Sequence, residues 1–197
     1  MRKGIQVKLL NKYYIVGRKS VPEIAKILKC SNNKVNYWLQ HYKIIKRTIS
    51  EAIYIKNNPN GDPFKFVPPK NLEEAKLFGM GVGLYWGEGN KANKNTVRLG
   101  NSDSKLLKIF IDFLIKFFNI KKEDMKFHLH IFSDIDINEA RNFWIKELGI
   151  KKEQIYKPMI TRTGALGIYK KKSKYGVMTV YYCNVKLRNL LVNILPM

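Results

Sequence analysis

The carboxylate of Glu88 is the group in the sequence with the clearest chemical potential, because it stands alone in a basic segment. Between Glu74 and Asp103 it is the only acidic residue, and Lys91 and Lys94 follow it closely. Basic neighbours keep a carboxyl group ionised, and an ionised carboxylate is a ligand for divalent cations. The alternative is a surface ion pair with Lys91, which would contribute little to stability. Spacing alone leaves both possibilities open.

Two histidines, His128 and His130, form a second candidate group. They alternate with apolar residues in the segment 125–132, which predicts a strand with both imidazoles on one face. The pair could hold a metal, but no third ligand is identifiable by spacing, so a polar sheet face or a phosphate contact is favoured. The segment 133–138 suggests a calcium loop only superficially, because the required glycine and the final glutamate are missing.

A helix rich in glycine precedes the isolated carboxylate. Asn71 followed by Glu74 forms a capping-box pattern, which predicts that the helix starts there. Each glycine inside a helix costs about 1 kcal/mol relative to alanine, so a packing role must offset the loss. Gly79, Gly83 and Gly87 recur at every fourth position and form a stripe along which another backbone can approach. A phosphate-binding glycine loop does not fit the spacing, and the energetic cost argues against a merely packed core helix.

The composition indicates a folded and strongly basic protein. The 197 residues include 37 Lys and Arg against 15 Asp and Glu, a formal net charge of +22 at pH 7. An apolar share of 45% excludes disorder, and the charge makes nucleic acid the first expected partner. Cys30 and Cys183 are far apart, which argues against a disulfide scaffold or a structural zinc site. Because neither a membrane span nor a secretory signal is evident, we expect a cytoplasmic protein without a membrane partner.

Turn-forming residues divide the sequence into two blocks. The segment 55–70 contains several prolines and asparagines and shows no helical or strand periodicity. We therefore expect a small all-α domain over 1–54, a linker over 55–70 and a second domain over 71–197. No internal repeat is visible in either block.

The first domain contains two short predicted helices joined by a tight turn. The segment 20–28 starts with a capping serine and an early proline, and a second helix is expected over 32–42. This pattern resembles the helix-turn-helix of DNA-binding proteins, in which Ala25 would lie at the close helix crossing. Lys29 stands where that family usually has glycine, so we expect Cys30 and Ser31 to take up the strain of the turn.

On this interpretation Val35 and Trp38 are buried, and the opposite side of the second helix faces DNA. Asparagine and glutamine side chains can form paired hydrogen bonds with adenine in the major groove. Lys43, Lys46 and Arg47 follow the helix and add positive charge. A helical hairpin used only for packing is the alternative. The expected DNA contacts of this helix are Asn32, Asn33, Lys34, Asn36, Tyr37 and Gln40.

The second domain mixes predicted strands with amphipathic helices, which gives an α+β fold with an antiparallel sheet. Strands are expected over 96–100 and 125–132, helices over 103–118, 136–148 and 184–195, and a hairpin from 166–169 into 177–183. One face of the sheet is polar and basic and can lie along DNA. The expected DNA contacts of this domain are Lys91, Lys94, Arg98, Lys126, His128, His130, Lys170 and Lys172.

The segment 82–89, Val-Gly-Leu-Tyr-Trp-Gly-Glu-Gly, resembles the motif of LAGLIDADG endonucleases in the variant that ends in Gly-Asp/Glu-Gly. Together with the segments 101–103 and 143–144, it is also similar to small proteins that join a helix-turn-helix to a LAGLIDADG-like saddle domain. The resemblance implies that Glu88 binds catalytic Mg²⁺ and that Asn101 orients water. It also implies that the glycine stripe packs on a second copy of the chain, because the sequence holds only one motif.

The expected function is therefore a Mg²⁺-dependent endonuclease that cleaves duplex DNA as a homodimer. The alternative is a sequence-specific DNA-binding protein of regulatory type that uses the same scaffold without cleaving. The segment 90–95 is short where homing endonucleases carry a long reading hairpin, which argues against site-specific homing. RNA or single-stranded partners would need exposed stacking aromatics, and Tyr169, Tyr175 and Tyr181 are the candidates.

Overall fold

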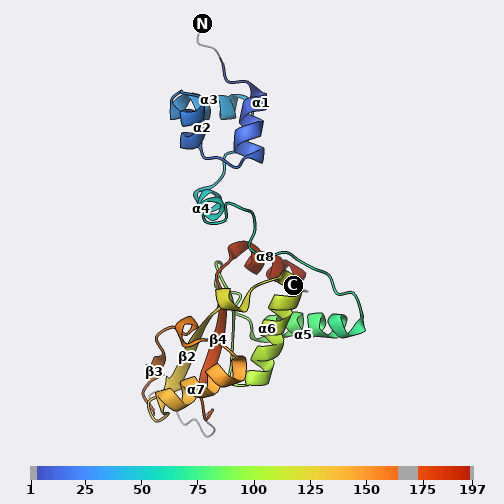
Figure 1. Cartoon of the computed structure of the whole chain (residues 1–197), viewed down its shortest axis with the longest axis vertical. Helices are drawn as coiled ribbons and strands as arrows, with labels where there is room; N and C mark the ends of the chain where they lie inside the picture. The colour runs from blue at the N-terminus through green and yellow to red at the C-terminus, as the bar shows by residue number, and fades with distance from the viewer. Residues whose placement is uncertain (1–3, 164–172, 196–197) are drawn as a thin grey trace. The chain divides into compact units, whose positions relative to one another are not determined.

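The computed structural model describes residues 4–163 and 173–195, and the chain divides into two compact units, 1–63 and 64–197 (Figure 1). Each unit has its own hydrophobic core. The first unit is helical, whereas the second combines helices with a four-stranded mixed sheet, so the chain is of the α+β class. No helix in the described ranges is long and apolar enough to cross a membrane.

The first unit packs short helices around a small apolar core. Its elements are α1 (Val7–Leu10), a π-helical continuation η1 (Asn11–Val16), α2 (Val21–Ile27), α3 (Asn32–His41) and α4 (Ile49–Asn57). The bounds of α2 and α3 agree closely with the two predicted helices. Trp38, however, is only partly buried, and the fully buried residues of α3 are Val35 and Leu39. The expectation for Trp38 was therefore wrong by one residue along the helix.

A complete capping box starts α2, as the sequence pattern indicated. The backbone amide of Ser20 donates to Glu23 Oε2 at 2.7 Å, and the amide of Glu23 donates to Ser20 Oγ at 3.4 Å. The hydroxyl and amide of Ser20 both donate to the carboxylate, and these hydrogen bonds lower the pKa of Glu23 below its ordinary value. A local polar signal therefore fixes where this helix begins.

The turn between α2 and α3 places its strain on Lys29. This residue has a φ of 48°, in the left-handed region, whereas Ser31 has an extended backbone and caps α3. The amide of Cys30 donates to the carbonyl of Ala25 at 2.9 Å and closes the turn. The expectation that Cys30 and Ser31 would take up the strain was therefore wrong. A lysine occupies the left-handed position that glycine adopts at least cost.

Replacing this lysine by glycine is expected to stabilise the first unit. Lys29→Gly should raise its free energy of unfolding by about 0.5–1 kcal/mol, because glycine adopts a positive φ without a steric penalty. Lys26→Gly, an exposed position inside α2, should instead lower it by about 1 kcal/mol. Hydrogen exchange of the α2 and α3 amides measures both effects. Equal loss of protection in the two variants would contradict the assignment of strain to Lys29.

The linker is shorter than the segment 55–70 that the sequence predicted. Residues 55–57 form the end of α4, and residues 64–67 belong to the second unit. The amides of Lys65 and Val67 donate to the carbonyls of Phe118 and Phe117, at 3.0 and 2.8 Å. The turn-forming residues therefore indicated correctly that two units are separated here. The part of the segment after Pro63, however, packs on the second core through Phe64.

The second unit consists of helices packed on one face of a sheet. Its elements are α5 (Leu72–Glu88), β1 (Val97–Asn101), α6 (Ser104–Phe118), η2 (Lys122–Asp124), β2 (Lys126–Phe132), α7 (Ile137–Leu148), η3 (Lys152–Gln154), β3 (Met159–Thr161), β4 (Val177–Tyr182) and α8 (Val185–Ile194). Side-chain caps begin four of the predicted helices, with Asn71 before α5, Asp103 before α6, Asp136 before α7 and Asn184 before α8. Only half of the predicted capping box at α5 forms, because the Glu74 carboxylate accepts from Lys70 rather than from Asn71.

The strand order is β1-β4-β2-β3, and the sheet is mixed rather than antiparallel. β4 pairs antiparallel with both β1 and β2, whereas β3 pairs parallel with β2. The expectation of an antiparallel sheet therefore fails at β3, a strand of three residues that is too short to show alternation. The first arm of the predicted hairpin, 166–169, lies outside the described residues, and its second arm is β4.

The two faces of the sheet differ sharply. The inner face carries buried side chains from β1, β2 and β4, including Leu99, Phe127 and Val180, which share one core with α5, α6, α7 and α8. Figure 1 shows α5 and α6 on the same side of the sheet. These two helices approach so closely that a Cβ at Gly81 would overlap the ring of Phe113. The outer face of the sheet carries the polar residues of the three longer strands.

Candidate functional site

The last residue of α5, Glu88, is held beside the edge strand β1. Gly89 forms an isolated antiparallel bridge with Leu99, and the amide of Asn90 donates to the carbonyl of Arg98 at 2.9 Å. β1 is an outer strand of the sheet, so this pairing fixes the C-terminal end of α5 at the sheet edge. Backbone pairing with β1 therefore fixes the position of Glu88, the residue just before the bridge.

The carboxylate of Glu88 is exposed and makes no hydrogen bond or ion pair with any residue that the structure describes. Lys91, the expected surface partner, instead donates from Nζ to the carbonyl of Trp86 at 2.5 Å. The alternative of a Glu88–Lys91 ion pair was therefore wrong. Glu88 is free to bind a ligand.

The loop that follows Glu88 is held by Arg188, a residue of α8 that the sequence analysis missed. Its Nε donates to the carbonyl of Asn93 at 3.1 Å, and its Nη2 donates to the carbonyl of Lys91. The side-chain oxygen of Asn93 accepts from the amides of Asn95 and Thr96, both at 3.0 Å. No local signal links residues about 95 positions apart, so only the structure reveals this clamp.

Tyr85 anchors the end of α5 in the core. It is fully buried, and its ring stacks on that of Phe110 with the centroids 6.0 Å apart. Gly89 is required beside it, because a Cβ there would overlap the Tyr85 ring and carbonyl. The Tyr85 hydroxyl has no hydrogen-bond partner in the described part of the chain. Burial raises the pKa of this phenol, and the positive charge of Arg188 opposes that shift.

Asn101, the expected partner of Glu88 in catalysis, ends β1. Its Oδ1 accepts from the amide of Asp103 at 2.9 Å and so stabilises the turn before α6. The structure records no hydrogen bond between Asn101 and Glu88. Its Nδ2 group donates to none of the described residues and remains available. Asn101 therefore stabilises the local turn through Oδ1, and its Nδ2 group donates to no described residue.

The described part of the chain does not surround Glu88 with a cluster of metal-ligating side chains. Among residues 4–163 and 173–195, no group of three or more His, Cys, Asp and Glu side chains lies close enough to hold an ion. His128 and His130 lie on the same face of β2 but make different contacts: His130 Nε2 lies 2.8 Å from Thr161 Oγ1, while His128 meets the ring of Tyr181 edge-on.

The glycine stripe of α5 faces open space. A Cβ built at Gly79, Gly83 or Gly87 would meet nothing within 4 Å. Among the large apolar side chains of the same helix that are exposed, Met80 at 47% and Trp86 at 50% lie within the stretch that carries the stripe. Gly81 is the glycine that packs within the chain. Spacing therefore identified the stripe correctly but did not separate it from the glycine that α6 requires.

The outer face of the sheet gathers the predicted basic residues around Tyr181. Across the strands, Tyr181 of β4 is in register with Arg98 of β1 and Lys126 of β2, and Thr179 is in register with His128. All of these side chains are partly exposed. Lys94 is exposed in the loop after α5. Lys170 and Lys172, which were also predicted to contact DNA, lie outside the described residues.

The predicted DNA-contacting face of α3 is largely accessible. Asn32, Asn33, Tyr37 and Gln40 are exposed, and Lys34 and Asn36 are partly exposed. The ring of Tyr37 stacks on that of His41, with an interplanar angle of 11°. The polar face that the sequence predicted is therefore present on α3.

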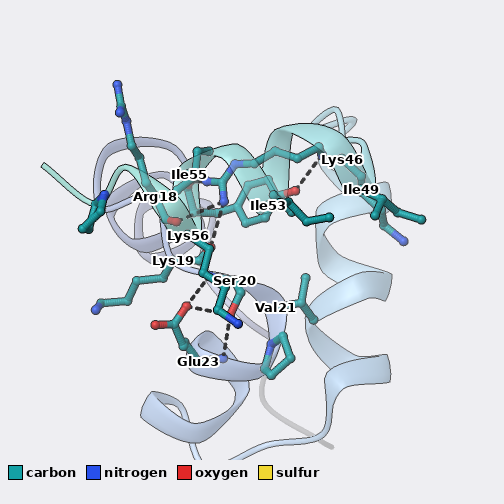
Figure 2. A pocket seen from close by; sticks show the side chains of 16 residues that line it. Arg18, Lys19, Ser20, Val21, Glu23, Lys46, Ile49, Ile53, Ile55 and Lys56 are labelled. Carbon is teal, nitrogen blue, oxygen red and sulfur yellow. Dashed lines mark hydrogen bonds between the residues drawn. The ribbon is translucent and has the colours of Figure 1, made fainter. Parts of the chain in front are cut away.

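Arg47, which was expected to add positive charge after α3, also has a structural role. Its guanidinium donates to the carbonyls of Tyr14, Arg18 and Lys19 and lies 4.1 Å from the centroid of the Tyr14 ring. It thereby ties the segment after α3 to the end of the π-helix. Figure 2 shows the neighbouring groove of the first unit, where Lys46 and Lys56 lie near Ile49 and Ile53 of α4.

Comparison of the chain with protein-family models, curated proteins and solved structures finds no match. A function is therefore inferred from the residues of this chain.

Proposed function

We propose that the protein is a Mg²⁺-dependent endonuclease of the LAGLIDADG type that cleaves duplex DNA as a homodimer, with a helix-turn-helix unit for DNA recognition. The observation that carries this proposal is the arrangement at α5. An unpaired, exposed carboxylate ends a helix whose three regularly spaced glycines face open space. The costly glycines and the free carboxylate both acquire a role if a second α5 packs along the stripe.

The homodimer follows from the need to cover this helix. Two copies related by a two-fold axis use the same patch on both partners, so one glycine stripe would lie against another. Such packing would also cover Met80 and Trp86, which are large apolar side chains exposed to water in the single chain. The Glu88 carboxylates of the two copies would then lie near the axis, one for each DNA strand.

Glu88 would hold the metal ion together with phosphate oxygens of the substrate, since carboxylate and phosphate oxygens suit Mg²⁺. Bound Mg²⁺ supplies Lewis-acid stabilisation of the phosphate charge and lowers the pKa of water. Asn101, at the end of β1, would orient water through its Nδ2 group, which donates to none of the described residues. Arg188 holds the loop after Glu88 and so limits the movement of the carboxylate.

Two surfaces would bind DNA, one contacting phosphates and the other contacting bases. The outer sheet face offers Arg98 and Lys126 to phosphates, and the exposed asparagines of α3 offer paired hydrogen bonds to bases. The net charge of +22 supports an electrostatic attraction to DNA. α2 and α3, joined by the tight turn at Lys29, would form the helix-turn-helix, with α3 as the recognition helix.

Metal removal tests the proposal most directly. Supercoiled plasmid incubated with the protein and Mg²⁺ should be converted to nicked and linear forms, whereas EDTA should stop the reaction and added Mg²⁺ should restore it. Agarose gel electrophoresis measures the conversion. The same turnover with and without EDTA would contradict a metal-dependent mechanism.

A second candidate function is sequence-specific DNA binding without cleavage. It is favoured by one observation: the exposed polar face of α3 is complete within one chain, whereas the cleavage site has a single carboxylate. A protein that binds DNA tightly but never cuts the plasmid, with any divalent cation, would support this function over the nuclease.

A further inference from the structure

The outer sheet face carries an aromatic cluster whose tyrosines are not used by the proposed contacts to duplex DNA. Tyr181 lies at its centre, with Tyr156 and His128 beside it. The ring of Tyr156 meets that of Tyr181 at 82°, and the ring of His128 meets it at 84°, with centroids 6.1 and 6.4 Å apart. Two rings thus stand nearly perpendicular to the central ring.

The position of Tyr156 is set by the backbone. Its amide donates to the carbonyl of Phe127 at 2.8 Å, and the adjacent Ile155 bridges the same residue. The segment before β3 is thereby fixed against β2, and the side chain remains 46% exposed. A held backbone with an exposed ring loses little conformational entropy when a planar ligand stacks on it.

Positive charge surrounds the cluster. The guanidinium of Arg98 lies 4.9 Å from the centroid of Tyr181 and is oriented by a hydrogen bond from its Nε to Thr96 Oγ1 at 2.6 Å. Lys126 is in register with Tyr181 on the other side. A ligand that combines a flat aromatic group with negative charge fits this arrangement.

The bases of an intact duplex do not satisfy this requirement, because their faces are stacked on one another. The basic side chains in register with Tyr181, Arg98 and Lys126, suit phosphates, and the rings of Tyr156 and Tyr181 have no free base face to stack on in an intact duplex. An unpaired base offers its free face to a tyrosine ring, and its phosphates offer negative charge to Arg98 and Lys126.

We propose that the outer sheet face, through Tyr156 and Tyr181, binds an unpaired nucleotide of DNA, so that the preferred substrate is duplex DNA containing an extrahelical or bulged base. This inference rests on the proposed DNA-directed function and names the class of DNA. Of the other aromatic candidates, Tyr175 is occupied, because its ring stacks on Phe143 at 3.9 Å. Tyr169 lies outside the described residues.

The test compares one oligonucleotide duplex in two forms, fully paired and with a single bulged 2-aminopurine, using the full-length protein without Mg²⁺. Fluorescence anisotropy gives both dissociation constants, and 2-aminopurine emission reports stacking. The bulged duplex should bind about ten-fold more tightly, as expected for one base stacked on an aromatic side chain. Emission from the bulged base should fall on binding.

Variants locate the effect on the sheet. Tyr156→Leu and Tyr181→Leu should each remove most of the preference for the bulged duplex, whereas Tyr156→Phe, which keeps the ring, should retain it. Tyr37→Leu, on α3, should weaken both duplexes alike. Circular dichroism checks that each variant is folded.

Equal affinity for the two duplexes, or a preference that survives both leucine variants, would overturn the assignment while leaving the nuclease proposal intact. Failure to bind either duplex would remove both proposals. If the protein prefers the bulged duplex but never cleaves plasmid, only the nuclease proposal is wrong.

Discussion

Glu88→Gln is expected to abolish Mg²⁺-dependent cleavage while leaving DNA affinity nearly unchanged. The substitution preserves the side-chain volume but removes the charge that would hold the metal in the proposed mechanism. Because a bound metal contributes several kcal/mol to the stabilisation of the transition state, the rate should fall about a thousand-fold. Single-turnover cleavage of plasmid measures the rate, and anisotropy in EDTA measures binding separately.

Glu73→Gln is the matched control for this substitution. Glu73 lies in the first turn of the same helix and forms an exposed ion pair with Lys76 at 2.9 Å, which contributes little to stability. Its loss should leave both cleavage and binding at the wild-type level. If Glu88→Gln cleaves as fast as Glu73→Gln, the catalytic assignment of Glu88 is wrong.

Helix positions were predictable because their signals are local. Helices begin where the pattern indicated at four residues whose side chains each accept a hydrogen bond from a backbone amide two or three residues later: Ser20, Ser31, Asn71 and Asp103. β3 escaped prediction because its pairing with β2 is non-local and its three residues carry no alternation. The contact of Arg47 with Tyr14 of η1, 33 residues away in the sequence, is likewise non-local.

The candidate site was predictable only in part, for the same reason. The isolation of Glu88 in sequence did correspond to a carboxylate without an ion pair among the described residues. The hydrogen bonds from Arg188 join α8 to the loop after Glu88, about 95 residues away, and no local sequence pattern predicts such a contact. The capping role of the Asn101 oxygen was also missed, although an asparagine two residues before Asp103 is a common local turn signal. The prediction of the site was therefore limited by the non-local contact of Arg188 and by the local turn that occupies the Asn101 oxygen.

The glycines of α5 allow a sharp test of the homodimer. Gly83→Leu should leave the single chain folded, because a side chain at this position meets open space. In the dimer the same leucine would overpack the contact between two helices at a cost of about 1–3 kcal/mol, raising the dissociation constant of the dimer about 10- to 100-fold. Sedimentation equilibrium measures the association.

Gly81 provides the opposite case on the same helix. A Cβ there overlaps the ring of Phe113, so Gly81→Ala should destabilise the second unit by about 3 kcal/mol without acting on the interface directly. Gly83→Ala should instead raise the free energy of unfolding of the single chain by about 1 kcal/mol, because alanine favours the helix and meets no neighbour. Chemical denaturation separates these effects from association.

Cleavage should follow dimerisation, because each copy contributes one Glu88. Gly83→Leu is therefore expected to lose plasmid cleavage at concentrations where the wild type is dimeric, while binding through α3 persists in the single chain. Raising the protein concentration should partly restore cleavage, which a defect within the fold would not allow. A wild type that stays monomeric with and without DNA, or a Gly83→Leu variant as dimeric as its parent, would show that the stripe is not an interface. The two-carboxylate mechanism would then fail with it.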